Sequence, residues 1–267
     1  MRTVIVFLLC LASSWVTAQG TRDEHAFQAT SAHLKLGYSD WSEQHRDTNE
    51  FVMRERTPLI SVGVEGTLPS QNPRLPVTLL LEATTGIIFY HGGDILTNEQ
   101  KKSVEVYVGV REELISHAHM VEGDGYFAGP FLGVGHTMFV KTSGPEIWNV
   151  LYTRLGVETA FRVSRTQLFA NAGVVVPVLA LDHGLHVNIN YEDGLYIPHG
   201  RASLFCEVGA KFGDGPTMSI AYDSMRLSQS ASVNSHQLFG SKTQAFLQPD
   251  TKSYTISLKV SYRFGRK

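Results

Sequence analysis

Alternation of apolar and polar residues with a period of two constrains this chain more than any other feature. Every second residue from Tyr254 to Phe264 is apolar, and every residue between them, from Thr255 to Arg263, is polar or charged. Successive side chains of a β-strand point to opposite faces. The segment therefore predicts a strand with one apolar and one polar face.

The same alternation recurs along the chain and predicts about ten strands. Between residues 202 and 212, for example, the apolar positions are Ala202, Leu204, Cys206, Val208, Ala210 and Phe212. The ten segments are 25–38, 56–69, 75–91, 102–112, 126–141, 149–163, 167–181, 200–212, 216–229 and 252–264. The apolar phase slips within 216–229, which indicates a β-bulge there.

The connections between these segments alternate between short and long. Turn-forming residues at 70–73, 164–166 and 213–215 mark short connections, whereas 39–55, 182–199 and 230–251 are long. The connection near 113–125 is the exception, because it takes a short place in this alternation but is about 13 residues long. Brief turns at one end and long loops at the other are typical of an outer-membrane barrel, and they place both termini on the periplasmic side.

The first eighteen residues have the layout of a secretory signal. Arg2 precedes the apolar run 4–11, and the small-residue end 16–18 predicts cleavage after Ala18. We expect residues 19–267 to form one barrel domain with a single cysteine, Cys206, and hence no internal disulfide. The longest apolar run in that region, 172–181, is half the length of a membrane-spanning helix.

Charge is scarce, at 18% of residues against about 25% in an average soluble domain. With a net charge of −2, the chain has no excess of positive charge of the kind that binds nucleic acid. A membrane barrel must be apolar outside for about 25 Å, while its interior is polar. We therefore expect a network of paired charges inside, formed by Lys35, Glu65, Glu82, Glu105, Arg154, Glu158, Glu207, Lys211, Lys259 and Arg263. A soluble ligand-binding barrel would place the apolar face inside instead.

The chain resembles the small outer-membrane β-barrel proteins of Gram-negative bacteria. Besides the signal and the strand meander, its C-terminal stretch is similar to the signal read by the barrel-assembly machinery, with Ser257, Tyr262 and Phe264 at matching positions. Lys259 stands where that signal usually has glycine, and residues 265–267 extend beyond it. The resemblance implies insertion into the outer membrane by that machinery, with membrane lipid as a partner.

The sequence thus predicts an all-β fold, a closed antiparallel up-and-down transmembrane barrel of about ten strands. A structural or surface-interaction role is expected, with narrow porin-like passage of small solutes if the interior is open. No cofactor and no metal are expected, and no motif identifies a surface ligand. Aromatic residues near strand ends are interpreted as girdles at the membrane interfaces: Tyr38, Trp41, Tyr90, Trp148, Tyr191, Tyr196, Tyr254 and Tyr262.

A hydrolase acting at the outer rim, like an omptin protease or a lipid deacylase, is the alternative function. Acids stand beside histidines in two predicted loops, as Asp40, Glu43, His45 and Asp47 and as Asp182, His183, His186 and Asp193. A deacylase would need a His–Ser pair, for which His136 with Thr137 and His33 with Ser31 are poor substitutes. His117 and His119 would share one face of a strand, with Glu122 nearby. No third residue stands at a spacing that would complete a metal site with the two histidines.

Overall fold

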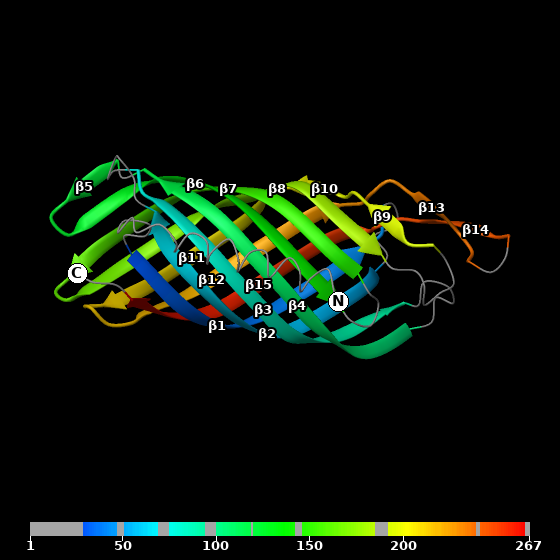
Figure 1. The fold of residues 1–267 in the computed structure, drawn as a ribbon, viewed down its shortest axis with the longest axis horizontal. Helices are drawn as coiled ribbons and strands as arrows, with labels where there is room; N and C mark the ends of the chain where they lie inside the picture. Colours follow the sequence, from blue (N-terminus) through cyan, green and yellow to red (C-terminus); the bar gives the residue numbers. More distant parts are fainter. Residues whose placement is uncertain are drawn as a thin grey trace, which may run out of the picture.

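A computed structural model describes residues 29–46, 51–68, 75–93, 100–118, 120–141, 146–184, 192–238 and 241–264. They form a closed antiparallel barrel of ten strands (Figure 1). The barrel strands are β1 (Ala29–Gln44), β2 (Phe51–Leu68), β3 (Val77–Gly93), β4 (Gln100–His117), β6 (Tyr126–Lys141), β7 (Glu146–Val163), β8 (Thr166–Gly184), β11 (Ser203–Phe212), β12 (Thr217–Ser228) and β15 (Asp250–Phe264). Strand β15 pairs with both β12 and β1, and this double pairing closes the ring.

Five further strands are short: β5 (Val121–Gly123), β9 (Gly194–Tyr196), β10 (His199–Arg201), β13 (Val233–His236) and β14 (Thr243–Phe246). Strand β10 pairs with β12 and continues the place of β11 in the ring towards the loop end. Strand β5 folds back on β6 at the end of the barrel that carries the short connections, here called the turn end. Strands β9, β13 and β14 lie at the opposite end, here called the loop end (Figure 1). The β5 hairpin accounts for the one connection that the sequence did not show as short.

The predicted barrel architecture is confirmed, but the strands reach further towards the loop end than expected. Strand β1 continues to Gln44 and β2 starts at Phe51. The alternation weakens there because outward residues become polar, as Asp40 and Arg54 do. Residues 39–55 are therefore largely strand rather than loop.

The predicted bulge does not lie on the segment 216–229 itself but on the strand beside it. Strand β12 keeps one continuous register with β11 and with β15, whereas its register shifts by one residue between the pair Arg201–Arg226 on β10 and the pair Phe205–Asp223 on β11. Other register shifts lie at Glu43/Gln44 and Leu151/Tyr152. Leu227 is buried and Met225 packs against the interior core. The phase slip therefore records a change in which face of the strand is apolar.

The outer face of the barrel is apolar along every barrel strand, and its side chains are exposed. Typical exposed fractions are 53% for Leu36, 57% for Val62, 55% for Leu155 and 64% for Leu204. The outward residues of the last strand are likewise exposed: Tyr254, Ile256, Leu258, Val260, Tyr262 and Phe264. A soluble barrel would bury such residues, so this distribution fits a barrel whose solvent is hydrocarbon.

The interior also contains an aromatic core, which the sequence did not predict. Its buried members are Trp41, Met53, Phe131, Phe139, Trp148, Val150, Tyr152, Val175, Ala180, Phe205 and Leu227. The assignment of Trp41, Tyr90, Trp148 and Tyr196 to outer girdles is wrong, because Tyr90 packs against this core and the other three are buried. Tyr38, Tyr254 and Tyr262 are exposed as a girdle requires, whereas Tyr191 lies outside the described residues.

Within the described ranges, no helix is long and apolar enough to cross a membrane. The predicted signal at 1–18 lies outside the described residues. Two turn-end connections contain a glycine with positive φ, Gly125 at 88° and Gly213 at 56°. Glycine adopts this backbone conformation without the steric penalty of a Cβ atom, which explains these turns.

Candidate functional site

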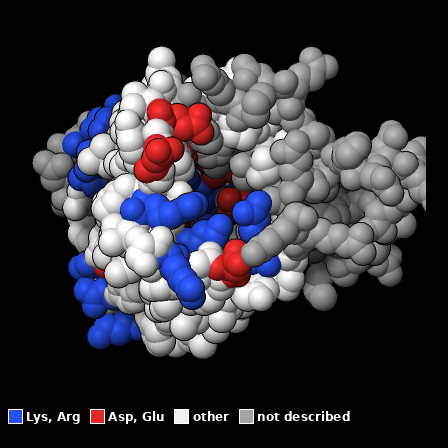
Figure 2. Space-filling model, turned by 90° about the vertical axis from the view of Figure 1, so that its left-hand side faces the viewer, with Lys and Arg blue, Asp and Glu red and all other residues white. Residues whose placement is uncertain are grey.

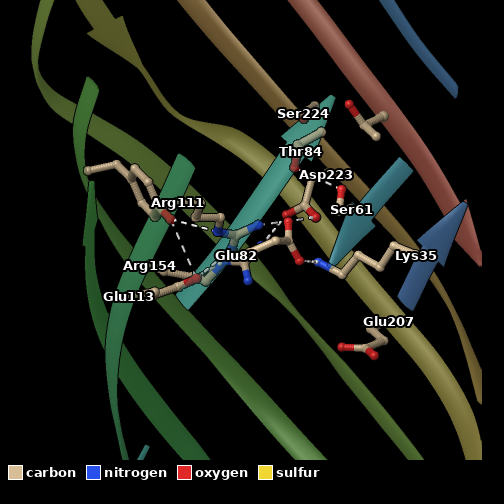
Figure 3. A network of polar contacts seen from close by, with 12 residues as sticks. Lys35, Ser61, Glu82, Thr84, Arg111, Glu113, Arg154, Glu207, Asp223 and Ser224 are labelled. Carbon is tan, nitrogen blue, oxygen red and sulfur yellow. Dashed lines mark hydrogen bonds and ion pairs between the residues drawn. The ribbon is translucent and has the colours of Figure 1, made fainter. Parts of the chain in front are cut away.

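Six charged side chains meet near the middle of the barrel interior and form what we call the crossing network (Figure 3). Its members are Lys35, Glu82, Arg111, Glu113, Arg154 and Asp223. Arg111 donates to Glu113, and Arg154 donates to Asp223. Lys35 Nζ lies 2.5 Å from Glu82 Oε2. Three cations therefore face three carboxylates, and the network is balanced in charge.

The crossing network spans the whole width of the barrel. Arg111 lies on β4 and Asp223 on β12, and four strands separate β4 from β12 in either direction around the ring. Even so, Arg111 Nη1 is 4.0 Å from Asp223 Oδ2. Opposite walls of the barrel are thus joined by an ion pair.

Neighbouring polar and aromatic groups hold the crossing network in place. The hydroxyl of Tyr152 lies 2.9 Å from Arg111 Nε. The Arg154 guanidinium lies 4.0 Å from the ring centroid of Phe205, which is a favourable cation–π arrangement. The Glu113 side chain is 0% exposed. Such an environment fits charges that are packed within protein rather than lining open water.

A second group of side chains, all buried except the partly exposed Glu146, closes the interior towards the loop end and is here called the loop-end cluster. It consists of Trp41, Glu43, Glu55, Phe139, Lys141, Glu146, Trp148 and Asp182. Lys141 Nζ is 3.0 Å from Glu55 Oε2 and 3.2 Å from Glu146 Oε2. The rings of Trp41 and Trp148 lie 5.3 Å apart, although β1 and β7 are opposite strands of the barrel.

The loop-end cluster contains more carboxyl groups than bases. Glu43 accepts hydrogen bonds from Trp41 Nε1 and Gln248 Nε2, at 2.9 and 2.7 Å. Asp182 is 1% exposed, and its Oδ1 atom has no hydrogen-bond partner among the residues that the structure describes. Burial, with Asp182 nearby, raises the pKa of the Tyr196 phenol on β9. Tyr196 is therefore a neutral neighbour of this acidic group.

A third group of polar residues lines the interior at the turn end. Lys259 Nζ is 3.3 Å from Glu65 Oε2, and Ser219 donates to Glu207 at 2.6 Å. Glu158, Gln167, Phe169, Asn171, Lys211 and Thr217 line a cavity of about 200 Å³. Figure 2 shows the barrel hollowed at this end, with basic and acidic side chains around the opening.

The structure places most of the predicted interior charges in these groups. Lys35, Glu82 and Arg154 lie in the crossing network. The turn-end group holds Glu65, Glu158, Glu207, Lys211 and Lys259. Glu105 lies apart from both, accepts from Ser103 at 3.0 Å and is buried. Arg263 is exposed near the turn end and joins no ion pair among the described residues.

Several residues of the site were missed from the sequence, namely Arg111, Glu113, Asp223 and Lys141. Arg111 stands on the polar face of its segment, so the alternation itself could have identified it. Glu113 lies just beyond the predicted end of that strand, and Asp223 lies where the apolar phase slips. Lys141 ends a strand in which aromatic residues occupy the inner face.

The described histidines and acids of the predicted rim form no hydrogen-bonded acid–histidine pair of the kind a hydrolytic site needs. His183 Nε2 is 4.0 Å from Asp193 Oδ2, beyond hydrogen-bond distance. Asp40 faces Arg54 on the outer surface, with Nη2 and Oδ2 2.6 Å apart, and Glu43 points inward. His45 has no acid partner among the described residues, whereas Asp47 and His186 lie outside them.

Of the remaining histidine candidates, one lies on the opposite face of its strand from the expected hydroxyl group, and two contact a glutamate instead. His136 faces outward and pairs with Glu112, so it is on the opposite face from Thr137. His33 Nε2 is 2.8 Å from Glu82, and His117 Nδ1 is 2.8 Å from Glu158. His119 lies outside the described residues, and the described part of the chain contains no cluster of three or more metal-ligating side chains.

The predicted assembly signal lies on the closing strand β15. Tyr262 and Phe264 are about half exposed on the outer face, with ring centroids 5.3 Å apart. Ser257 is buried on the inner face beside Gly37 of β1. The two aromatic residues are thus accessible from outside the barrel, as recognition would require, and their role in assembly stays a prediction.

Comparison with known proteins identifies the fold and no family. No family profile and no curated protein sequence matches the chain. The outer membrane protease OmpT from Escherichia coli has a similar structure, with a TM-score of 0.51, 9% identity, and coverage of 89% of this chain and 97% of that one. The transport unit of the autotransporter AIDA-I from Escherichia coli has a TM-score of 0.46 and 10% identity, over 91% of this chain and 93% of that one. The fold of the chain is that of the bacterial outer-membrane β-barrels.

Proposed function

We propose that this chain is an integral outer-membrane barrel with a closed interior, whose role is structural or one of surface interaction through its loop end. The exposed apolar outer face supports the membrane location. The single observation that carries the closed interior is the contact of Arg111 with Asp223 from opposite strands. The Trp41–Trp148 contact supports it at a second level.

Porin-like passage of small solutes, the alternative function, would require an open interior. Ion pathways need a continuous polar lumen, and the wide lumens of porins come from more strands than ten. Along β7, Trp148 of the loop-end cluster, Arg154 of the crossing network and Glu158 of the turn-end cavity of about 200 Å³ follow one another, so the cavity and the cluster lie on opposite sides of the network. These positions favour an anchor over a channel.

Conductance of the refolded chain in a planar lipid bilayer tests this proposal. We expect insertion, seen as co-flotation with vesicles, without steady single-channel conductance. A variant carrying Arg111→Ala and Asp223→Ala together with Trp41→Ala and Trp148→Ala should conduct, because both closures are removed. Steady conductance of the unmodified protein would refute the closed interior.

A rim hydrolase is the second candidate, supported by His183 and Asp193 at 4.0 Å on the loop-end surface. A modest movement would bring these groups into hydrogen-bond contact. Cleavage of a fluorogenic peptide library by the folded protein, lost in His183→Ala, would establish this function. Equal turnover by both proteins would eliminate this pair as its source.

A further inference from the structure

One ion pair interrupts the apolar outer face in the middle of the barrel wall. Glu112 on β4 and His136 on β6 are register partners, and Nδ1 of His136 lies 3.1 Å from Oε1 of Glu112. Both point outward, with side chains 38% and 28% exposed. Exposed apolar residues flank the pair along both strands: Val106, Val108 and Leu114 on β4, and Leu132 and Val134 on β6.

The position of this pair distinguishes it from other ion pairs on the described outer surface. Asp40 with Arg54, for instance, lies beyond the outward apolar run of its strand, near the loop end. Ionisable side chains within the hydrocarbon zone are costly, and they commonly mark a functional site. Glu112 and His136 have no partners among the described residues except each other, so Oε2 and Nε2 remain available to another molecule.

The surroundings of the pair favour an interface over a hydrolytic site. The outward neighbours of His136 on its own strand are Val134 and Met138. Neither can act as a nucleophile, so a His–Glu dyad here would have no hydroxyl or thiol beside it to activate. What the pair offers is one hydrogen-bond donor and one acceptor on an otherwise apolar stretch of the outer wall.

We propose that this face of β4 and β6 binds a second copy of the same chain. A twofold axis along the membrane normal reverses the left-to-right order of the two side chains in the partner copy. His136 of each copy then faces Glu112 of the other, so one patch is complementary to itself, as an isologous interface requires. The apolar residues around the pair pack across the same contact. This inference rests on the membrane location proposed above.

Sedimentation equilibrium of the folded full chain, in density-matched detergent micelles, tests the interface. The unmodified protein should dimerise reversibly. By symmetry, the contact between His136 of one copy and Glu112 of the other occurs twice in the dimer. The double variant Glu112→Leu with His136→Leu removes both contacts, and each loss should raise the dissociation constant of the dimer on the order of tenfold. The exchange variant Glu112→His with His136→Glu keeps the pair and should restore dimerisation, whereas Glu112→His alone should not.

Disulfide cross-linking in lipid vesicles locates the interface. An equimolar mixture of Val134→Cys and Leu114→Cys chains, each in a Cys206→Ser background, should give a covalent dimer, because the twofold axis sets position 134 of one copy opposite position 114 of the other. Ile256→Cys in the same background is the matched control, because β15 lies opposite β6 in the ring. Circular dichroism checks that every variant is folded.

Each outcome separates failure of the interface from failure of the membrane location. A monomer at all concentrations, undiminished dimerisation of the Leu/Leu variant, or cross-linking through position 256 rather than 134 would overturn the interface. A folded, monodisperse protein without detergent would instead overturn the membrane location.

Discussion

Replacement of Glu113 by alanine tests whether the barrel interior is closed. In the structure this carboxylate is 0% exposed, accepts from Arg111 and lies 3.6 Å from Arg154 Nε. Its removal leaves the two buried guanidiniums of Arg111 and Arg154 with one carboxylate, Asp223, between them, and this unbalanced buried charge costs about 3–5 kcal/mol of unfolding free energy. If the same ion pair lined a water-filled pore, its loss would cost about 1 kcal/mol or less.

Urea unfolding in lipid vesicles measures this difference through tryptophan fluorescence. Trp15 lies in the predicted signal, so a protein prepared from residues 19–267 has only Trp41 and Trp148, both inside the barrel. The double variant Glu113→Leu with Arg111→Met removes both charges and should recover most of the stability, because apolar substitutes for a buried pair are often neutral or stabilising. A cost below about 1 kcal/mol for Glu113→Ala, with no coupling to Arg111→Met, would refute the closed-interior reasoning.

Three further predictions concern the two faces of the wall. Cys206→Arg, between the exposed Leu204 and Val208, should cost about 2–4 kcal/mol in vesicle unfolding, whereas Cys206→Ser should be far milder; equal stability of Arg and wild type would place this residue away from lipid. Trp148→Ala should cost about 3–5 kcal/mol in the same assay, since the indole is fully buried, and a cost under about 1 kcal/mol would contradict its packing. The mature chain diluted from urea without detergent should aggregate by light scattering; a clear, folded solution would favour the soluble barrel.

The fold was predictable because one face of nearly every strand is uniform. Residues 254–264 alternate without a break, and a one-residue error in register would expose every polar side chain to the apolar side. The bounds at the loop end were less predictable, since outward Asp40 and Arg54 remove the contrast between the faces. The interior was harder still, because Trp41, Phe139 and Trp148 are apolar residues on a face expected to be polar.

The candidate site was predictable only as a collection of inward charges. Alternation places Lys35, Glu82 and Arg154 on the inner face, but it does not say which strands meet across the barrel. The Arg111–Asp223 contact depends on the ring closing so that β4 and β12 lie opposite each other. That arrangement follows from strand number and stagger, which no short stretch of sequence records.

Closure of the ring by β1 and β15 has a consequence for how the chain reaches its native state. The two strands pair from Thr30 with Phe264 to Gln44 with Asp250, so this seam joins the two extremes of the described chain. Loop-closure entropy must be overcome before such contacts form, which makes folding slow. A ribosome-bound or C-terminally truncated chain would leave β1 and β12 as unpaired edges open to aggregation. Folding of this barrel therefore has to wait until its last strand has been synthesised.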